Sequence, residues 1–455
     1  MSIILSHAYY LFEDEKEQKI MRPYPPLGLL YVSSYLNFHN VKNEVYDSTF
    51  NSFREQLNFI KKKQPKILAI YTNLMTKVNV IKLIKELRSY NVVEDLSIIL
   101  GGPDVTFNSE NYLKAGADFL VIGEGEQTSL ELCSALLKKT PFENIPGIAF
   151  LVNGKVIKTN ARTRIKELKD LPLPNRDAIS IERYMETWKN YHGKSSLTVS
   201  TQRGCPYTCK WCSTAVYGQS YRRRPANLVA EELKMLKSKY NPDYIWFVDD
   251  VFTVSHKWLK SFREEVLKQK AIIPFECITR AERLNDEVLR LLKESGCYRI
   301  WIGAESGSQK IIDAMDRRVE VNVVKKAIQK ANALNIETGT FIMVGYPGED
   351  ISDIENTVEY LKEANPTSFT ITIAYPIKGT SLYEEIEDKI TVQPNWEVTT
   401  DREIDFKRTY HRKFYDYAVR YVINEVNSTR SNNFFLFGKL KLKAFLAKIG
   451  MLYYK

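Results

Sequence analysis

The sequence predicts an α/β protein. A doubly wound, Rossmann-like parallel sheet should be followed by a partial (β/α)6 barrel of the TIM type and a short helical C-terminal tail. Short apolar runs alternate with amphipathic segments of helical length, which is typical of parallel sheets. The second series of strands has six members rather than the eight of a closed barrel. At 455 residues, the chain is also long enough for two or three domains.

The first domain, residues 1–145, should contain the doubly wound sheet. Its candidate strands are 3–5, 44–46, 67–71, 97–100 and 119–122, and its candidate helices are 27–37, 53–62, 78–89 and 127–138. Loop-forming residues follow three of the strands: YTN at 71–73, GGPD at 101–104 and GEGE at 123–126. Ligands bind beyond the carboxyl ends of such strands, where glycine lets the backbone approach them closely. We therefore expect a ligand crevice at this edge, although each loop taken alone could simply make a turn.

A hairpin and a linker, residues 146–190, are expected next. Asn153 and Gly154 are a two-residue turn signal between apolar runs, and the prolines and charges of 166–179 are typical of a linker. The partial barrel should occupy residues 191–385. Its candidate strands are 197–200, 244–248, 275–278, 299–303, 340–344 and 369–374, and its candidate helices are 227–239, 256–269, 286–295, 322–335 and 351–363. Residues 386–455 should form a helical, basic C-terminal region.

Composition and charge argue against several classes of protein. No run of 18 apolar residues occurs, so no membrane span is expected. The first residues lack the basic n-region and cleavage site of a signal peptide, and six cysteines in such a chain argue against a disulfide framework. We therefore expect a cytoplasmic protein. The net charge of +10 does not predict nucleic-acid binding, because eight of these ten charges lie in the last 51 residues.

Three of the six cysteines crowd into RGCPYTCKWCST, residues 203–214, directly after the first barrel strand. A zinc site would need a fourth ligand, and no Cys or His follows within 40 residues of the loop. A redox dithiol would use Cys209 and Cys212 but leave Cys205 idle. An iron–sulfur cluster held by three thiolates uses all three cysteines and leaves one iron open to an outside ligand.

This loop resembles the cluster loop of the radical S-adenosylmethionine (SAM) enzymes. Their pattern is Cys-x3-Cys-x-aromatic-Cys, and Trp211 fills the aromatic position. The resemblance implies a [4Fe–4S] cluster on Cys205, Cys209 and Cys212 whose free iron binds SAM. It also implies that an external one-electron reductant drives SAM cleavage, which activates an unreactive C–H bond. No residue stands out as a general acid or base.

Two later strand ends extend the resemblance. WFVDDVFT at 246–253 ends the second barrel strand, and WIGAESGS at 301–308 ends the fourth. The resemblance assigns the following residues to SAM: Trp211, beside the adenine, and Asp249, Asp250, Glu305 and Ser306. The alternatives are a helix N-cap for the acidic pair and a structural role for Glu305. Arg280, after the third strand, could pair with a carboxylate in the site or on the surface.

The first domain resembles the cobalamin-binding domain that precedes the barrel in one subclass of these enzymes. The similar segments are PYPPLGLLYVSSYL at 23–36, ILGGPDVTF at 99–107 and DFLVIGEGEQTSLEL at 118–132. The resemblance assigns the following residues to cobalamin: Pro26, Thr72, Asn73, Gly101, Gly102, Pro103, Gly123, Glu124 and Gly125. The Asp-x-His-x-x-Gly loop of other cobalamin proteins is absent, and no histidine occurs between His39 and His192. We therefore expect no histidine ligand to cobalt from this domain, which could also be a relic scaffold.

The segment 439–455 has the pattern of a basic amphipathic helix. Leu442, Phe445, Leu446 and Ile449 recur with helical spacing, and lysines flank them. Such a helix suits the surface of an anionic bilayer, here the inner face of the membrane, and hints at a lipid-like substrate. The alternative is a helix packed on the barrel with its lysines in water.

The leading functional prediction is a cobalamin-dependent radical SAM enzyme that functionalises an unactivated carbon by methyl transfer, on a small-molecule or lipid-like substrate. A radical SAM cyclase or rearrangement enzyme on a lipid- or tetrapyrrole-like substrate is the second hypothesis. A non-catalytic iron–sulfur or corrinoid-binding protein is the third. A tRNA-thiolating relative is not expected, because Cys133 is the one cysteine of the first domain and cannot hold a second cluster.

Overall fold

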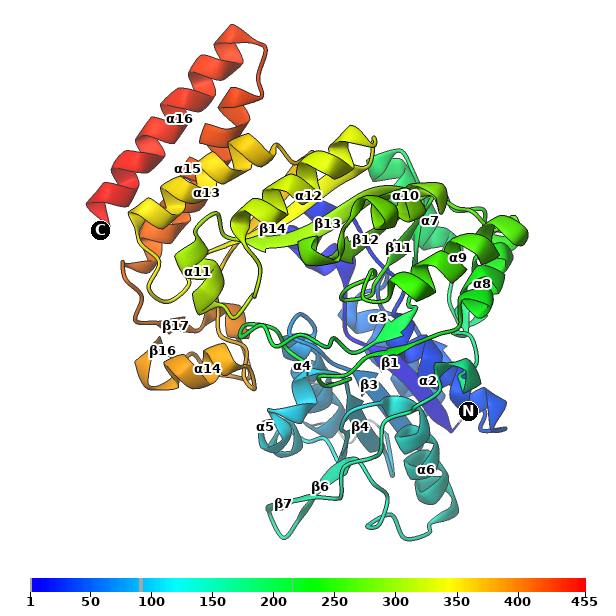
Figure 1. The fold of residues 1–455 in the computed structure, drawn as a ribbon. Coiled ribbons are helices and arrows are strands. Elements are labelled where there is room, and N and C mark those ends of the chain that lie inside the picture. Colours follow the sequence, from blue (N-terminus) through cyan, green and yellow to red (C-terminus); the bar gives the residue numbers. More distant parts are fainter. Residues whose placement is uncertain (1, 90–92, 215) are drawn as a thin grey trace.

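The computed structural model describes residues 2–89, 93–214 and 216–455. In Figure 1 the first domain, drawn in blue and cyan, lies below the barrel, drawn in green and yellow. The last two helices, in orange and red, project on the far side of the barrel from the first domain. The predicted order of a first parallel sheet, a partial barrel and a helical tail is therefore confirmed.

Seven strands form the first sheet, in the order β2-β1-β3-β4-β5-β6-β7. Their bounds are β1 Ile3–His7, β2 Glu44–Tyr46, β3 Ile67–Tyr71, β4 Ser97–Gly101, β5 Phe119–Val121, β6 Ile148–Val152 and β7 Lys155–Lys158. The first five strands are parallel, whereas β6 and β7 are antiparallel to their neighbours. The predicted hairpin is present, but it pairs with β5 and thus extends the first sheet instead of standing between two domains.

Helices cover both faces of this sheet, as the alternating pattern predicts. One face carries α3 (Phe53–Lys63), α4 (Lys77–Ser89) and α5 (Ser109–Lys114), and the other carries α2 (Leu27–Phe38) and α6 (Gly125–Lys138). Along β3, Leu68 and Ile70 join the first core while Ile67 joins the second. This alternation follows because successive side chains of a strand point to opposite faces. A further helix, α1 (Glu15–Ile20), precedes α2 and is not among the predicted helices.

The segment predicted as a linker is tied to both domains. The backbone N–H of Asn175 donates to Leu30 O of α2 at 3.1 Å, and its side chain donates to Ser33 Oγ. The next residue, Arg176, is buried and donates to Thr198 O and to Glu232 Oε1 in the barrel. Helix α7 (Ile181–His192) then leads into the first barrel strand. The segment therefore fixes the two domains against each other instead of separating them.

Six parallel strands make the barrel, in the order β15-β14-β13-β12-β11-β8. Their bounds are β8 Ser196–Val199, β11 Tyr244–Phe247, β12 Phe275–Thr279, β13 Cys297–Glu305, β14 Glu337–Val344 and β15 Ser368–Ile373. The helices that alternate with them are α8 Ala226–Lys239, α9 His256–Lys268, α10 Asp286–Glu294, α11 Gln309–Ala314, α12 Val321–Ala333 and α13 Ile351–Ala364. In the described residues β8 and β15 do not pair with each other, so the barrel is open along one side.

The region after the barrel is only partly helical. Helix α14 (Ser381–Ile386) is followed by a small antiparallel pair, β16 (Ile390–Val392) and β17 (Asp405–Phe406), which the sequence did not predict. Helices α15 (Arg412–Thr429) and α16 (Phe434–Tyr453) then run side by side (Figure 1). Among the described residues, no helix is both long and apolar enough to cross a membrane.

We predict that the buried carboxylate of Glu232 is essential to stability. It pairs with Arg176 of the connecting segment at 3.1 Å and with Arg224 at 2.5 Å. Burial opposes the charge, but the two guanidinium groups outweigh it and hold the pKa of Glu232 below its usual range. Glu232→Gln should lower the free energy of unfolding by about 3 kcal/mol, because it leaves buried arginines without their partner.

The measurement is urea unfolding, with Glu231→Gln, its exposed neighbour on the same helix, as the control. Because the folded-state pKa of Glu232 is lowered, its stabilisation is present above the unfolded pKa of about 4.3. The difference between wild type and Glu232→Gln should therefore shrink as the pH falls through the folded-state pKa. Equal stability of the three proteins at neutral pH would contradict the prediction.

Candidate active site

The cysteine loop follows β8 and is held by the barrel around it. Within the loop, the backbone of Lys210 donates to Met315 O at 3.2 Å and accepts from Leu382 N at 2.8 Å. Thr208 Oγ1 donates to Asp316 Oδ2 at 2.7 Å. Where the loop begins, Gly204 adopts a φ of +82°, and a Cβ there would overlap Ser220. The loop therefore needs glycine at this position, since it combines a left-handed backbone with close packing.

The three cysteines of the loop are free thiols. Cys205 and Cys212 line the same cavity, whereas Cys209 lies half-buried beside them. Cys212 is accessible from the cavity, but the surrounding protein removes much of its hydration and, with the negative charge of Asp250, raises its pKa to about 12. Because thiolates are the metal-binding form, a bound metal must displace these protons.

This donor set fits a [4Fe–4S] cluster. In the described part of the chain, no three His, Cys, Asp or Glu side chains converge on one point that could hold a single ion. A four-iron cluster has a different requirement, because its protein ligands bind separate irons and do not share one atom. Three unpaired thiols in one loop, two of them facing a cavity, meet that requirement.

Arg280 contacts the cysteine loop directly. It follows β12 and is buried, and its Nη1 donates to Cys209 Sγ at 3.3 Å. Its guanidinium also stacks on Tyr207 at 3.9 Å and pairs with Glu282. The sequence left open whether this arginine pairs in the site or on the surface; in the structure its carboxylate partner is the partly exposed Glu282, while its guanidinium lies against the cysteine loop. An N–H donor to a cluster sulfur is one of the features that set a cluster's reduction potential.

Glu305 ends β13 in a strained position near the cysteines. Its φ is +66°, which is uncommon for a residue other than glycine and marks stored strain. A Cβ on Gly303 would overlap the Glu305 carboxylate, so the glycine leaves room for it. Burial raises the pKa of Glu305 to about 7, although the positive charges of Arg317 and Arg280 oppose this shift. The group can thus change its charge near neutral pH.

The two aspartates after β11 have different surroundings. Asp249 is fully buried and accepts hydrogen bonds from Thr201 N at 2.7 Å, Gln202 N at 2.9 Å and the Thr201 hydroxyl. Its carboxylate therefore holds the segment before the cysteine loop and does not face the cavity. Asp250 is exposed and lines the cavity. Of the predicted pair, only Asp250 is placed where it could contact a ligand.

Two further residues predicted at SAM face other partners. The Ser306 hydroxyl bonds Thr357 Oγ1 of α13 at 3.3 Å and accepts from Ser308 N. Trp211 packs against the apolar cluster that contains Met343 and Tyr346. Neither residue lines the cavity beside the cysteines, and their contacts with SAM stay predictions.

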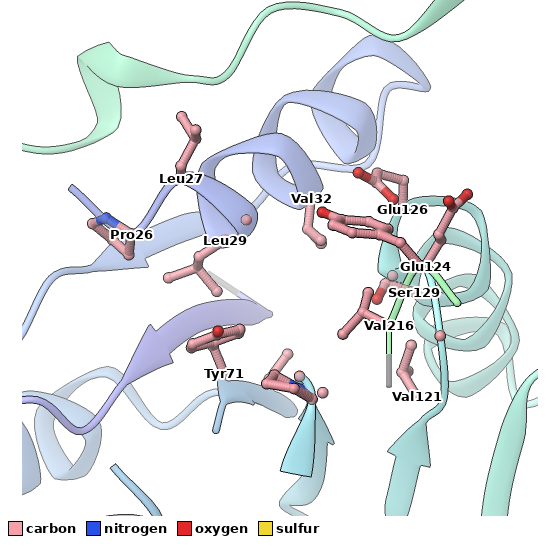
Figure 2. Close-up of a pocket in the computed structure, with 18 of the residues that line it drawn as sticks. Pro26, Leu27, Leu29, Val32, Tyr71, Val121, Glu124, Glu126, Ser129 and Val216 are labelled. Carbon is pink, nitrogen blue, oxygen red and sulfur yellow. The ribbon is translucent and has the colours of Figure 1, made fainter. Parts of the chain in front are cut away.

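A cavity of about 560 Å³ lies between the first domain and the cysteine loop. Figure 2 shows Leu29, Tyr71 and Val121 of the first domain around it, with Val216 of the barrel segment. Seven residues predicted at cobalamin line this cavity: Pro26, Gly101, Gly102, Pro103, Gly123, Glu124 and Gly125. The volume is within the range of about 300–1,000 Å³ that is usual for small-molecule and cofactor sites. No histidine is among the residues described as lining it.

The other two residues predicted at cobalamin are directed away from the cavity. The Thr72 hydroxyl bonds the Tyr112 hydroxyl inside the first domain, at 3.2 Å. The Asn73 side chain accepts from the backbone of Met75 and Thr76, in the turn before α4. Gly102 explains part of this arrangement: its φ is +125°, and a Cβ there would overlap Thr72 O. The backbone of Thr72 therefore packs against Gly102, while its side chain points into the first domain.

Buried ion pairs join the two sides of the cavity. Arg203, two residues before the first cysteine, pairs with Glu126 of α6, and Arg222 pairs with Glu124. Glu124 also accepts from Ile165 N at 2.9 Å, so its carboxylate is engaged by the chain itself. Sequence reasoning missed Arg203 and Arg222, because an arginine beside a motif has no pattern that reveals a partner about 80 to 100 residues away.

Two models of known families match the chain, one over the barrel and one over the first domain. A model of the radical SAM superfamily matches residues 199–361, and a model of the B12 binding domain matches residues 19–133. An uncharacterized methyltransferase of Pyrococcus horikoshii is 30% identical over 381 residues, which cover 82% of this chain and 81% of the relative. The anaerobic magnesium-protoporphyrin IX monomethyl ester cyclase of Rubrivivax gelatinosus is 26% identical over 383 residues, 81% of this chain and 67% of the cyclase.

Two solved structures share the fold. The cobalamin-dependent S-adenosylmethionine radical enzyme OxsB, with aqua-cobalamin and S-adenosylmethionine bound, has a TM-score of 0.78 and 16% identity, covering 99% of this chain and 72% of its own. The radical S-adenosylmethionine methyltransferase TsrM from Kitasatospora setae, with cobalamin and a [4Fe-4S] cluster bound, has a TM-score of 0.70 and 15% identity. That match covers 85% of this chain and 75% of TsrM.

We predict that Cys205→Ala abolishes cluster loading. After anaerobic reconstitution the wild type should hold about four irons per chain, whereas the variant should retain few, because three thiolates anchor the cluster. Iron and sulfide analysis with electron paramagnetic resonance provides the measurement. Cys133→Ala is the matched control, since Cys133 is buried in the first domain. Loading of Cys205→Ala to the level of this control would refute the assignment.

We predict that SAM binding depends on the ionisation of Glu305. A carboxylate can accept hydrogen bonds from an ammonium group or ribose hydroxyls, but a neutral carboxyl loses part of that capacity. Affinity for SAM, measured by calorimetry on the cluster-loaded protein, should therefore fall as the pH drops through about 7. Glu305→Gln should bind SAM weakly and without this pH dependence. Ser306→Ala is the control, and a Glu305→Gln variant with the wild-type pH profile would contradict the prediction.

Proposed function

Because the chain belongs to the radical SAM superfamily and carries a B12-binding domain, we propose that it transfers a methyl group to an unactivated carbon. The observation that carries the proposal is the single cavity that the cysteine loop and the glycine-rich loops of the first domain both line. An enzyme that uses the two cofactors together needs their sites to adjoin. Separate cavities would have favoured independent roles.

In this proposal the chain holds and orients three bound groups. Cys205, Cys209 and Cys212 would hold the [4Fe–4S] cluster, and Glu305 and Asp250 would contact SAM. The loops around Gly102 and Gly123 would bind cobalamin through backbone that comes close to the corrin. The cofactors supply radical generation and methyl transfer when bound, and the protein supplies orientation and exclusion of water.

The apolar side chains of the cavity wall suit the binding of a planar corrin. Leu29, Val32 and Tyr71 line it from the first domain, while the carboxylates of Glu124 and Glu126 are occupied by arginines. Because these two carboxylates are paired with arginines of the protein, they do not need a positive charge from the ligand. The wall can therefore exclude water without leaving an unpaired carboxylate beside the cofactor.

A cyclase or rearrangement enzyme is the second candidate. The Rubrivivax relative, named as a cyclase, shares 26% identity across both domains and favours this candidate. The chain matches the Pyrococcus relative, named as a methyltransferase, at 30% identity, and this favours methyl transfer. We propose a small-molecule or lipid-like substrate and an external one-electron donor. Six free cysteines fit a reducing, cytoplasmic location.

The test uses SAM labelled with ¹³C in its methyl group, protein loaded with both cofactors and an added chemical one-electron reductant, which supplies the electron that cleaves SAM. Methyl transfer predicts that 5′-deoxyadenosine and S-adenosylhomocysteine form together and that the label enters the product. Candidate acceptors would include hydrophobic extracts of the source cells, with Cys205→Ala as the inactive control. Cleavage of SAM without label in any product would favour the cyclase, and no cleavage with any extract would favour a non-catalytic binding protein.

A further inference from the structure

Helix α16 presents an apolar surface to solvent. Six of its residues leave between 48% and 81% of their surface exposed: Leu442, Phe445, Leu446, Ile449, Leu452 and Tyr453. Phe434 and Phe435, at its first turn, are more than 80% exposed. The outer side of a helix on a soluble protein is normally polar, because it faces water. Contiguous exposed apolar surface of this kind marks a binding surface.

The opposite side of α16 is already occupied. Ala444, Ala447 and Met451 are buried against α15, and Gly450 lies so close to the Tyr417 ring that a Cβ would overlap it. These small residues let the two helices approach closely. Helix α15 in turn contacts α13 and β15 of the barrel. The helix is thus fixed to the protein by its small residues, and the larger apolar residues remain outside.

Lysines border the exposed surface on both sides. On one border Lys441 pairs with Glu425 and Lys448 with Glu355, each at 2.7 Å. On the other border Lys439 and Lys443 are exposed and form no ion pair with any described residue. No acidic residue occurs between 434 and 455. The surface therefore offers positive charge beside apolar side chains and no carboxylate of its own.

We propose that this surface of α16 docks on an anionic lipid bilayer. Apolar side chains would enter the boundary between headgroups and acyl chains, and Lys439 and Lys443 would lie at the level of the phosphates. Charge complementarity favours this occupant over a second copy of the chain. Two copies paired through this surface would bring two α16 helices together that contain lysines and no carboxylate, and Glu425 and Glu355 at the border are already paired, whereas anionic headgroups neutralise the unpaired lysines.

The docking surface lies away from the cofactor cavity. In Figure 1, α16 is on the far side of the barrel from the first domain, so a bilayer against α16 would leave the cavity between the domains uncovered. Attachment and catalysis thus use separate surfaces. Loss of docking should leave binding of SAM and cobalamin unchanged, so a failed docking test does not count against the proposed function.

The experiment is vesicle flotation of the full chain loaded with its cluster. Vesicles of phosphatidylcholine alone are compared with vesicles of equal parts phosphatidylcholine and phosphatidylglycerol. The wild type should float with the anionic vesicles, and added salt should weaken this binding because it screens the lysines. Lys439→Gln with Lys443→Gln should lower the partition coefficient roughly 30-fold, and Phe445→Gln with Ile449→Gln roughly tenfold or more.

The matched control is Phe38→Gln. Phe38 is 68% exposed, against 61% for Phe445, but it lies at the end of α2 in the first domain. The control should bind vesicles like the wild type, and thermal unfolding should show that all variants are folded. The proposal is overturned if the wild type stays unbound with anionic vesicles, or if Phe38→Gln weakens binding as much as the α16 variants. It is also overturned if sedimentation shows a dimer that Phe445→Gln with Ile449→Gln dissociates while vesicles fail to bind.

Discussion

The arrangement of this protein depends on buried charge pairs between the two domains. Arg203 and Arg222 come from the short strands that flank the cysteine loop, and their partners Glu126 and Glu124 come from the start of α6. Arg203 also lies over the rings of Tyr31 and Tyr217 at 5.6 and 5.2 Å. Breaking such a pair leaves an uncompensated buried charge, which costs far more than a surface pair would. The loop that carries the cysteines is therefore bound to the loop that carries the glycines.

The same principle operates around the cavity. Burial raises the pKa of both Asp249 and Glu305, but the two carboxylates have different partners. Asp249 accepts hydrogen bonds from two backbone N–H groups and a hydroxyl, and so holds the backbone before the cysteine loop. Glu305 faces the positive charges of Arg317 and Arg280 instead. These surroundings, more than the positions of the two residues after β11 and at the end of β13, distinguish a residue that fixes the backbone from the one we propose to bind SAM.

The sequence predicted the fold well because the periodicity of apolar residues and the spacing of successive elements can be read locally. All six barrel strands and the five parallel strands of the first sheet occur within a few residues of their expected bounds. The β16–β17 pair and the joining of the hairpin to β5 were missed, because strand pairing depends on partners that no local pattern identifies. The site shows the same limit. Glycines at strand ends were located correctly, whereas the direction of the Thr72, Asn73 and Ser306 side chains depends on contacts from distant segments.

The contacts of the cysteine loop bear on how the metal centre is assembled. Asp249 fixes the residues before the loop, and Met315 and Leu382 hold its middle through backbone hydrogen bonds. None of these bonds involves a cysteine sulfur, so they hold the backbone of the loop and leave its thiols available for metal. In small zinc domains, by contrast, the metal supplies the folding free energy. Here backbone hydrogen bonds add to what metal–thiolate bonds contribute, and metal that enters the cavity would reach Cys205 and Cys212 directly.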